Sequence, residues 1–175
     1  GKSAFLSFIL MTQMFPSIML LVPFYKILSI YGLNNSLVGL CVVYISFTIP
    51  FCSWMMVGYY RTIPVEIDES AAIDGASSIQ TFLRITLPLV RPGLVSSAIY
   101  AFITCWNEYL LSYTLLTDAK KFPISVGLKY LVGEYSTDYS ALAAGCIIAL
   151  IPPILLFAYV QKNLVSGMNA GAVKG

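Results

Sequence analysis

The sequence predicts an all-α fold, a polytopic bundle of transmembrane helices, from its composition, its hydropathy and the length of its charge-free runs. Apolar residues make up 58% of the 175-residue chain and charged residues only 10%, so a soluble globule of this size would lack polar surface. The mean hydropathy is +0.82. Three runs without charge, residues 3–25, 27–60 and 139–161, each reach the roughly 20 residues that a helix needs to cross a bilayer.

Four membrane spans are expected. The run 92–107 is short alone, and it reaches the length of a span if Glu108 is accepted within the membrane. The chain begins at Gly1 and has no small-residue cleavage site after its first apolar run. We therefore expect a fragment in which residues 1–175 form one transmembrane domain. The expected spans are residues 5–25, 36–58, 93–115 and 140–161.

Prolines interrupt the first, second and fourth of these spans. In a soluble helix each would cost about 3 kcal/mol, but neighbouring helices in a bundle can bond the carbonyls that proline leaves free. Two interpretations remain open, namely kinks that packing requires and hinges for a gate. Between the first two spans, the polar turn at residues 31–36 makes the two helices antiparallel neighbours.

The polar loop of residues 59–92 predicts a hairpin of two short helices. A proline and three acidic residues favour the start of the first helix. Gly75 can end that helix because glycine adopts a positive φ without strain. Ser77 and Gln80 have the spacing of a capping box for the second helix, which we expect Pro88 to end.

The loop of residues 117–139 is predicted to be exposed, with one short amphipathic helix within 124–131 that lies on the surface. Four spans place this loop on one side of the membrane, and the loop 59–92 with both chain ends on the other. The latter side holds six of the ten basic residues. This is a weak excess in the direction that the positive-inside rule gives for a cytoplasmic side.

Several function classes are excluded by composition. A net charge of +2 with scattered basic residues does not indicate nucleic-acid binding. The chain has no glycine-rich phosphate-binding loop and no histidine, so we expect neither ATP hydrolysis nor another enzymatic activity. Without histidine or a C-x-x-C pair we expect no metal site, and we interpret the four cysteines as buried apolar residues: Cys41, Cys52, Cys105 and Cys146.

Within the loop 59–92, a set of residues stands at fixed spacing: Glu69-Ser70-Ala71, then Gly75 after three residues, then Ile85, Leu87 and Pro88 after nine more. This pattern resembles the EAA loop through which ABC import permeases meet their ATPase. Ser70 stands where the family has the middle alanine, and the spacing is intact. The resemblance implies that the hairpin is a cytoplasmic coupling element.

The rest of the chain resembles the carbohydrate subgroup of these permeases, the maltose-type inner-membrane components. The similarity lies in residues 12–16, in Trp106-Asn107-Glu108 and in residues 170–175. It implies that the chain covers the third to sixth helices of a six-helix subunit in a bacterial cytoplasmic (inner) membrane. Such a subunit forms part of the path of a sugar.

The family resemblance also implies partners. These are a second permease subunit, a dimer of ATP-binding subunits, an extracytoplasmic solute-binding protein and membrane lipid. ATP and Mg²⁺ are then used by the ATPase, and this chain itself binds no cofactor. Nucleic acid is not among the expected partners.

The residues that the resemblance assigns to ATPase coupling are Glu69, Ser70, Ala71, Asp74, Gly75, Ala76, Leu87 and Pro88. Glu69 would offer a charge to a basic partner, and Ala71 and Gly75 would permit close approach. The pair Leu87-Pro88 would fix the hairpin to the third span. The alternative is a helical loop without a partner.

The tail, residues 162–175, would be cytoplasmic and reach the ATPase dimer interface through Ala170, Gly171 and Ala172. Met168 and Asn169 stand where the subgroup has leucine and threonine, so the contact would differ in detail. The alternative is a disordered end.

Glu108 is singled out because a carboxylate at membrane depth is costly and suggests a function. Trp106 could stack on a sugar and Asn107 could bond one, so that the three residues line a sugar path. Alternatively, Glu108 and Asn107 tie helices together or cap a buried helix end.

Two further function classes stay open. A self-contained channel or ion-driven carrier would place several ionisable groups at mid-bilayer and show repeated halves. Only Glu108 meets the first condition and no repeat is visible. An ABC permease for another small solute, such as a polyamine or phosphonate, is the second; the carbohydrate-like tail favours a sugar.

Overall fold

The computed structural model describes the backbone of residues 2–133 and 136–172 and the side chains of residues 4–133 and 136–161. The regular structure of these residues is helical, in agreement with the predicted all-α fold. The elements in chain order are α1 (Lys2–Met11), the 3₁₀ turn η1 (Thr12–Met14), α2 (Ser17–Ile30), α3 (Leu37–Tyr60), α4 (Val65–Ile73), α5 (Ser78–Thr81), the π-helical turn η2 (Phe82–Thr86), α6 (Leu87–Leu89), α7 (Arg91–Asn107), α8 (Leu110–Leu115), the 3₁₀ turn η3 (Ala119–Lys121), α9 (Ile124–Lys129) and α10 (Tyr139–Ala172).

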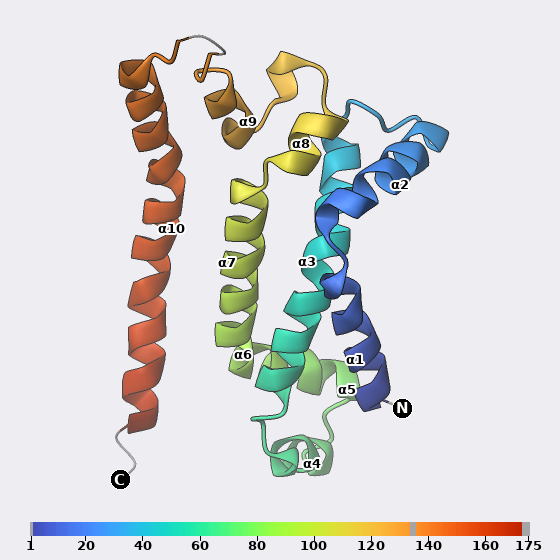
Figure 1. The fold of residues 1–175 in the computed structure, drawn as a ribbon. Coiled ribbons are helices and arrows are strands. Elements are labelled where there is room, and N and C mark those ends of the chain that lie inside the picture. Colours follow the sequence, from blue (N-terminus) through green and yellow to red (C-terminus); the bar gives the residue numbers. More distant parts are fainter. Residues whose placement is uncertain (1, 134–135, 173–175) are drawn as a thin grey trace.

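The long helices α3, α7 and α10 run along one common direction (Figure 1). The short helices α4, α5 and α6 lie at one end of the molecule, which we call the hairpin side, and α8 and α9 lie at the other, the far side. The start of α1 and the last turn of α10 are both at the hairpin side. This arrangement agrees with the prediction that the loop 59–92 and both ends of the chain share one side.

Among the residues that the structure describes, two continuous helices are long and apolar enough to cross a membrane, Leu37–Tyr60 and Tyr139–Gln161. Two bent pairs of helices meet the same test, one over residues 4–30 with a bend of 96° and one over residues 78–107 with a bend of 67°. The expected first span therefore lies in a sharply bent pair. The expected third span, 93–115, is interrupted after Asn107.

The first break has a local cause at Pro16. Proline forces the preceding residue out of the helical region, and Phe15 is extended, with φ −74° and ψ 125°. Pro16 then stands as the N-cap of α2, where its missing N–H costs nothing. The Gln13 side chain joins the segment before the break to α3, because its Nε2 donates to the Phe47 carbonyl at 2.9 Å.

The hairpin closes as predicted at Gly75. This residue has a φ of +79°, and two hydrogen bonds form a Schellman motif around it: Ala76 N–H to Ala71 O at 3.0 Å and Gly75 N–H to Ala72 O at 3.1 Å. A Cβ at Gly75 would have open space, so the backbone conformation alone requires glycine here.

The capping box is also confirmed. The Ser77 N–H donates to Gln80 Oε1 at 2.9 Å, and the Gln80 N–H donates to Ser77 Oγ at 3.4 Å. These bonds start α5 at the predicted position.

The prediction that Pro88 ends the second helix is wrong. Pro88 lies in the first turn of α6, where a helix needs no N–H from it. The preceding turn, η2, is π-helical, and single π-helical turns of this kind occur within α-helices. The helix therefore continues through Pro88. The chain bends only after Leu89, by 67°, before α7 begins.

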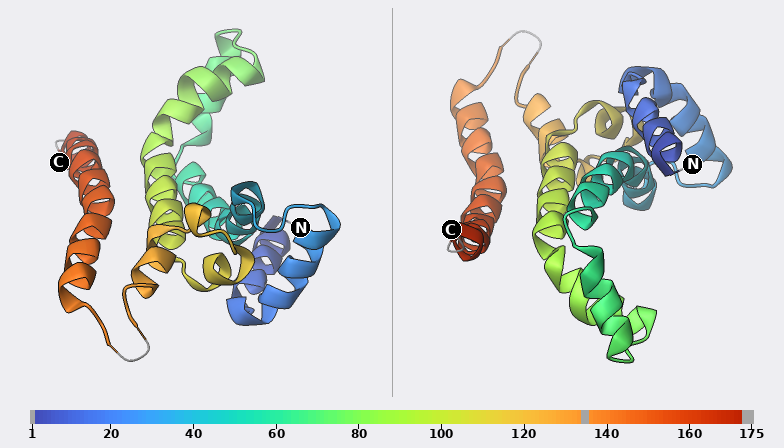
Figure 2. Two further views of the ribbon diagram at one scale, coloured as in Figure 1. Left: turned by 90° about the horizontal axis from the view of Figure 1, so that it is seen from above. Right: turned by 90° about the horizontal axis from the view of Figure 1, so that it is seen from below.

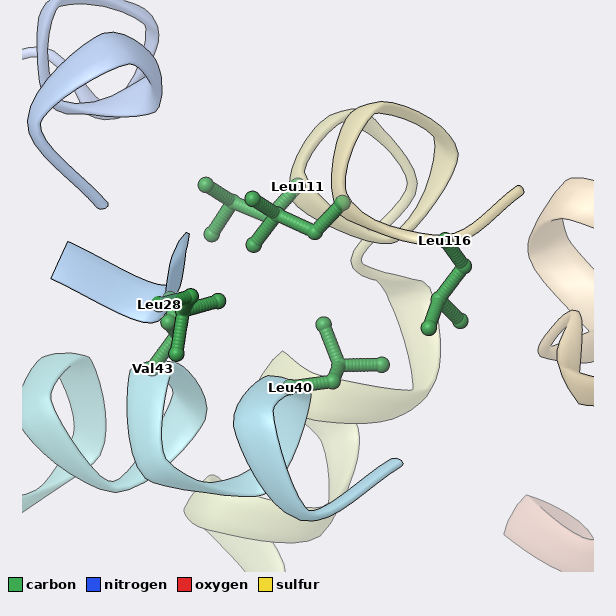
Figure 3. Close-up of a cluster of buried hydrophobic side chains, with 6 residues drawn as sticks. Leu28, Leu40, Val43, Leu111 and Leu116 are labelled. Carbon is green, nitrogen blue, oxygen red and sulfur yellow. The ribbon is translucent and has the colours of Figure 1, made fainter. Parts of the chain in front are cut away.

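The buried apolar core lies on the far side. It joins α2, α3 and α8 through Leu28, Leu40, Val43, Leu111, Leu115 and Leu116, and Figure 3 shows five of these side chains converging from the three helices and the segment after α8. Leu111 is 2% exposed and Val43 is 1% exposed. The end of α2, in the first bent pair, is thus buried against α3 and α8 of the same chain.

Asn35 fastens the turn between α2 and α3 to the chain after α8. Its backbone is left-handed, with φ +51°, a region that asparagine tolerates better than most residues. Its Oδ1 accepts hydrogen bonds from the N–H groups of Thr117 and Asp118, each at 3.0 Å. Its own N–H donates to Leu115 O at 3.2 Å, and Lys121 Nζ donates to its carbonyl at 2.6 Å.

On the hairpin side, α3 and α7 touch through a glycine. A Cβ at Gly93 would lie 2.5 Å from Cγ of Tyr59, so only glycine allows this approach. The Tyr59 hydroxyl shares a hydrogen bond with Ser96 Oγ at 3.2 Å. The helices α3 and α7 thereby form the central pair of the bundle.

Helix α10 lies at the edge of the bundle in every view (Figures 1 and 2). None of its most apolar 18-residue window is buried, and Phe157 is 69% exposed. It packs on α9 at Gly145, where a Cβ would lie 2.7 Å from Leu128 Cδ2. Helix α9 itself is not merely on the surface, because its Val126 is fully buried.

The cysteines correct one expectation. Cys52 and Cys105 are half-buried, but Cys41 and Cys146 are exposed. The prediction that all four are buried is therefore wrong for this chain, because α10 and one face of α3 have no covering helix within it.

Candidate functional site

The two helix breaks meet at the level of the middle of α3. Thr48 is central in this 24-residue helix, about 17 Å from either end at a rise of 1.5 Å per residue. A cavity of about 190 Å³ lies here. Its lining comes from both sides of each break and from α3: Gln13, Ser17, Tyr44, Phe47, Thr48, Tyr100, Thr104, Cys105, Glu108 and Leu111.

Glu108 forms the second break. It is extended, with ψ 129°, and its carboxylate turns onto the start of α8. Oε1 accepts from the Leu111 N–H at 2.6 Å and Oε2 from the Ser112 N–H at 3.1 Å. Unpaired N–H groups and the helix dipole both stabilise a carboxylate at this position. Glu108 therefore caps α8.

The same carboxylate ties α8 to α3. Oε2 also accepts from Ser112 Oγ at 2.8 Å and from the Tyr44 hydroxyl at 3.0 Å. On the other side, Ser125 Oγ of α9 donates to the Glu108 carbonyl at 2.6 Å. This geometry is that of the alternative in which Glu108 caps a helix end and ties helices together. Glu108 also forms part of the cavity wall.

Trp106 and Asn107, predicted with Glu108 to line a path, are outside this cavity, and Trp106 lines a second cavity of about 560 Å³ that shares Tyr44, Thr48 and Cys105 with it. The Trp106 Nε1–H donates to Ala149 O of α10 at 3.2 Å, and its ring stacks on Phe102 with centroids 5.3 Å apart. Asn107 is exposed and its Nδ2 donates to Ile103 O of its own helix at 3.0 Å. Neither residue lines the cavity between the breaks, so their role in a path stays a prediction.

The polar residues of the hairpin are on its outside. Glu69, Ser70, Asp74 and Gly75 are exposed, whereas Ala71 is 4% exposed and lies within the hairpin. Apolar side chains are exposed beside them, with Ile73 at 86%.

A hollow lies behind this surface. A cavity of about 380 Å³ is bounded by the end of α3, by α4 and by the helical turns after it. Ala72 and Ala76 line it together with Thr81 and Phe82. The hairpin is therefore held at its ends and is not packed tightly on a core.

Leu87 and Pro88 form the first turn of α6, next to the bend into α7. Leu87 is half-buried and Pro88 is exposed. The tail residues Ala170, Gly171 and Ala172 continue the backbone of α10, and their side chains lie outside the described residues. The assignment of these residues to ATPase contacts stays a prediction.

Sequence reasoning missed most of the cavity lining. Tyr100 and Thr104 are four residues apart on α7, so they share one helix face, and Glu108 follows four residues later at the C-cap. Tyr44 and Thr48 repeat this spacing on α3. A search for polar residues at i and i+4 within the apolar runs would have found both stripes.

The comparisons with known proteins place this arrangement in a family. The family model of the binding-protein-dependent transport system inner membrane component matches residues 1–170. The chain is 40% identical over 176 residues to the maltodextrin transport system permease protein MdxG of Bacillus subtilis (strain 168), covering 100% of this chain and 63% of that protein.

Other relatives agree. The trehalose transport system permease protein SugB of Mycobacterium tuberculosis (strain CDC 1551 / Oshkosh) is 34% identical, with 100% of this chain and 65% of that protein covered. Among solved structures, a chain of a bacterial ABC transporter involved in the import of the acidic polysaccharide alginate has a TM-score of 0.71 and 27% identity. That match covers 93% of this chain and 61% of the other.

The chain thus spans between 61% and 65% of the length of these three relatives. The match to the family model runs over both helix breaks, the cavity between them and the hairpin. The protein belongs to the family of binding-protein-dependent transport system inner membrane components.

Proposed function

We propose that this chain is a membrane-spanning permease subunit of an ABC importer, that it forms part of the path of a sugar, and that ATP is hydrolysed on a separate subunit. The observation that carries this proposal is the family match over residues 1–170. The names of two relatives, which transport maltodextrin and trehalose, support a sugar as the cargo.

The hairpin is the coupling element in this proposal. Four carboxylates lie within the nine residues 66–74 of the hairpin and all are exposed: Glu66, Asp68, Glu69 and Asp74. No basic residue lies in that stretch, so its surface complements a basic cleft on an ATPase. Closure of the ATPase dimer around ATP and Mg²⁺ would then move α4 and, through α5 and α6, tilt α7.

The remaining partners are a second permease subunit, which covers the exposed faces of α3 and α10, and an extracytoplasmic solute-binding protein at the far side. Since α10 has none of its apolar window buried within this chain, it needs lipid or another helix around it. The cytoplasmic membrane of a bacterium supplies both.

An ion-driven carrier is a weaker alternative on physical grounds. Such a protein needs an ionisable group that can change partners. Glu108 is the single carboxylate in the cavity lining, and its two oxygens already accept four hydrogen bonds. A cation-coupled mechanism would have to break this cap in every cycle.

The test is co-purification of the tagged subunit from its native membrane in mild detergent, with mass spectrometry of the recovered proteins. We expect a nucleotide-binding subunit and a second permease. In Gly75→Asp or Glu69→Lys, the nucleotide-binding subunit should be reduced at least tenfold while membrane insertion is unchanged, because Asp at Gly75 strains the left-handed turn and Lys reverses a charge.

Gly127→Asp is the matched control. A Cβ at Gly127 would also have open space around it, but this residue lies on α9 at the far side. Full recovery of the nucleotide-binding subunit in this variant is expected. Equal recovery from all four proteins would overturn the coupling role of the hairpin, and recovery of the wild-type subunit alone would overturn the importer.

A further inference from the structure

We propose that the cleft between α1 and the hairpin-side end of α3 binds one anionic phospholipid of the cytoplasmic leaflet, with the lipid phosphate at Arg61 and an acyl chain along Trp54. The inference rests on the proposed function, which makes the hairpin side cytoplasmic, and it adds a ligand to that function. The cleft is separate from the cavity between the helix breaks, because the two share no lining residue.

Two helices of this chain form the cleft. Helix α1 lies beside the hairpin-side half of α3 (Figures 1 and 2), and the space between them measures about 530 Å³. The α1 wall consists of Leu6, Ser7 and Leu10, and the other wall runs along α3 from Trp54 to the residues just after its end. Arg61 is the one charged side chain of the lining. The cleft is therefore apolar along its length and basic at its hairpin-side end.

The depth of Arg61 matches that of a lipid phosphate. The 24 residues of α3 are about 36 Å long at 1.5 Å per residue, which exceeds the roughly 30 Å of the hydrocarbon core. Arg61 directly follows this helix, so it lies at the level of the headgroups. Trp54 precedes it by seven residues and lies about 10 Å deeper, beside the acyl chains.

The Arg61 guanidinium is available to an anion. It forms no ion pair among the residues that the structure describes, and Asp68 of the hairpin lines a different hollow. A guanidinium can donate two parallel hydrogen bonds to one phosphate group. Basic pockets between transmembrane helices on the cytoplasmic side are typical sites for anionic headgroups, so charge and position both suit an anionic phospholipid.

Gly58 keeps the apolar part of the cleft open. It lies within α3, where glycine is less favourable than alanine. Its φ is not in the positive region, and a Cβ at this position would meet no atom within 4 Å. Neither the backbone nor packing within the described chain requires glycine here. A ligand in the cleft supplies the reason, because a side chain on residue 58 would take its space.

The width of the cleft favours an acyl chain over a helix of another subunit. Its α3 wall covers residues 54–62, about 12 Å at 1.5 Å per residue. A volume of about 530 Å³ over that length gives a mean cross-section of about 45 Å². A helix about 10 Å across needs about 80 Å², whereas a single file of methylene groups is much thinner.

The α3 wall is held from behind and is therefore preformed. Tyr59 is packed against Gly93 of α7, and its hydroxyl shares a hydrogen bond with Ser96 Oγ at 3.2 Å. The Trp54 ring packs on Phe51, with centroids 5.6 Å apart. A lipid that enters the cleft orders little of the protein, which lowers the cost of binding.

The first experiment measures the lipid that the complete transporter retains. The permease is purified with its ATPase and second permease from the native membrane in mild detergent, and the bound phospholipid is quantified by mass spectrometry. Arg61→Gln should lose one anionic phospholipid per copy of this subunit, because the charge is removed. Arg61→Lys keeps the charge and should retain the lipid. Arg84→Gln is the matched control, since Arg84 is exposed on the hairpin side but does not line the cleft.

A second variant tests the part of the site that holds the acyl chain. Gly58→Leu should remove the same lipid, because the leucine side chain fills the cleft and is well tolerated in a helix. Gly127→Leu is its control, because a Cβ at Gly127 also has open space, but on α9 at the far side. A site for free phosphate would not respond to Gly58→Leu, so loss of lipid in this variant assigns the site to a phospholipid.

Labelling of Gly58→Cys reports occupancy in a membrane. The complete transporter is placed in nanodiscs of phosphatidylcholine alone or of equal parts of phosphatidylcholine and phosphatidylglycerol. Reaction of the peptide that contains residue 58 with a lipid-soluble maleimide is followed by mass spectrometry. Phosphatidylglycerol should slow this reaction about threefold or more, as expected for a site that is at least about two-thirds occupied. It should have no such effect when Arg61→Gln is also present.

The outcomes separate this site from the proposed function. Equal lipid loss in Arg61→Gln and Arg84→Gln would overturn the site, as would full retention of lipid in Gly58→Leu. An equal rate of labelling in both nanodiscs would overturn it too, and a slow rate would then indicate a protein segment in the cleft. Each of these results leaves the proposed function intact if the nucleotide-binding subunit is still recovered. Recovery of the wild-type permease alone would overturn the proposed function and, with it, the cytoplasmic position of the cleft.

Discussion

The far side and the hairpin side of this protein differ in what holds them together. On the far side, six apolar residues with at most 4% exposure pack across three helices and the segment after α8. Asn35 adds four hydrogen bonds there, to the last residue of α8, to the segment after it and to η3. On the hairpin side, the apolar residues Ile73 and Ile79 are 86% and 71% exposed. The hairpin is stabilised by local capping and turn bonds.

The difference indicates how each side is used. A segment with its own core keeps its shape without a partner. A segment held by caps alone opens at a lower free energy and gains apolar burial when a partner covers it. We therefore expect substitutions on the far side to lower stability and substitutions on the hairpin side to weaken partner binding, and the opposite result would contradict this comparison.

The largest effect is expected for Leu111→Ala. Leu111 is 2% exposed in the far-side core, and truncation of a buried leucine costs about 2–5 kcal/mol. Thermal unfolding of the purified transporter in mild detergent should show a clearly lowered midpoint. A midpoint equal to that of the wild type would mean that the far side is not the stabilising core.

A smaller effect is expected for Asn35→Ala. The change removes the acceptor of two N–H groups and puts alanine at a φ of +51°, for a combined cost of about 1–3 kcal/mol. Two controls divide this cost. Asn35→Asp keeps the acceptor and should be milder, while Asn35→Gly relieves the backbone and loses the acceptor. Equal unfolding midpoints for all three variants would contradict the role of Asn35 in fastening this turn.

The smallest effect on unfolding is expected for Ile73→Ala. With 86% of the side chain exposed, truncation should change the free energy of unfolding by less than about 0.5 kcal/mol. Recovery of the nucleotide-binding subunit should nevertheless fall, because the partner loses apolar contact. A large loss of stability with normal recovery of that subunit would show that Ile73 serves the chain itself.

The sequence predicted the fold class and the chemistry of the hairpin. The left-handed Gly75 and the reciprocal bonds of Ser77 and Gln80 follow from local rules, since a turn or cap involves residues a few positions apart. The prediction that Pro88 ends a helix was wrong, because the π-helical turn before it changes the local hydrogen bonding and Pro88 falls in the first turn of α6.

The cavity could not be predicted because it depends on contacts between distant segments. Gln13 and Glu108 are 95 positions apart in the chain and meet at one cavity only because both helices break at the same depth. The break at Pro16 could be read from the sequence. The break at Glu108 was anticipated only in the alternative that this residue caps a buried helix end, and its partner Tyr44, on another helix, could not be read from the sequence.

The uninterrupted length of α7 has a mechanical consequence. Its 17 residues form a rod about 25 Å long, with the bend after Leu89 at one end and the Glu108 cap at the other. Gly93, pressed against Tyr59, is a fulcrum near the hairpin end. A swing of about 10° about that fulcrum would carry the distant end of α7 by about 4 Å, so a small displacement of the hairpin would become a larger one at the Glu108 cap.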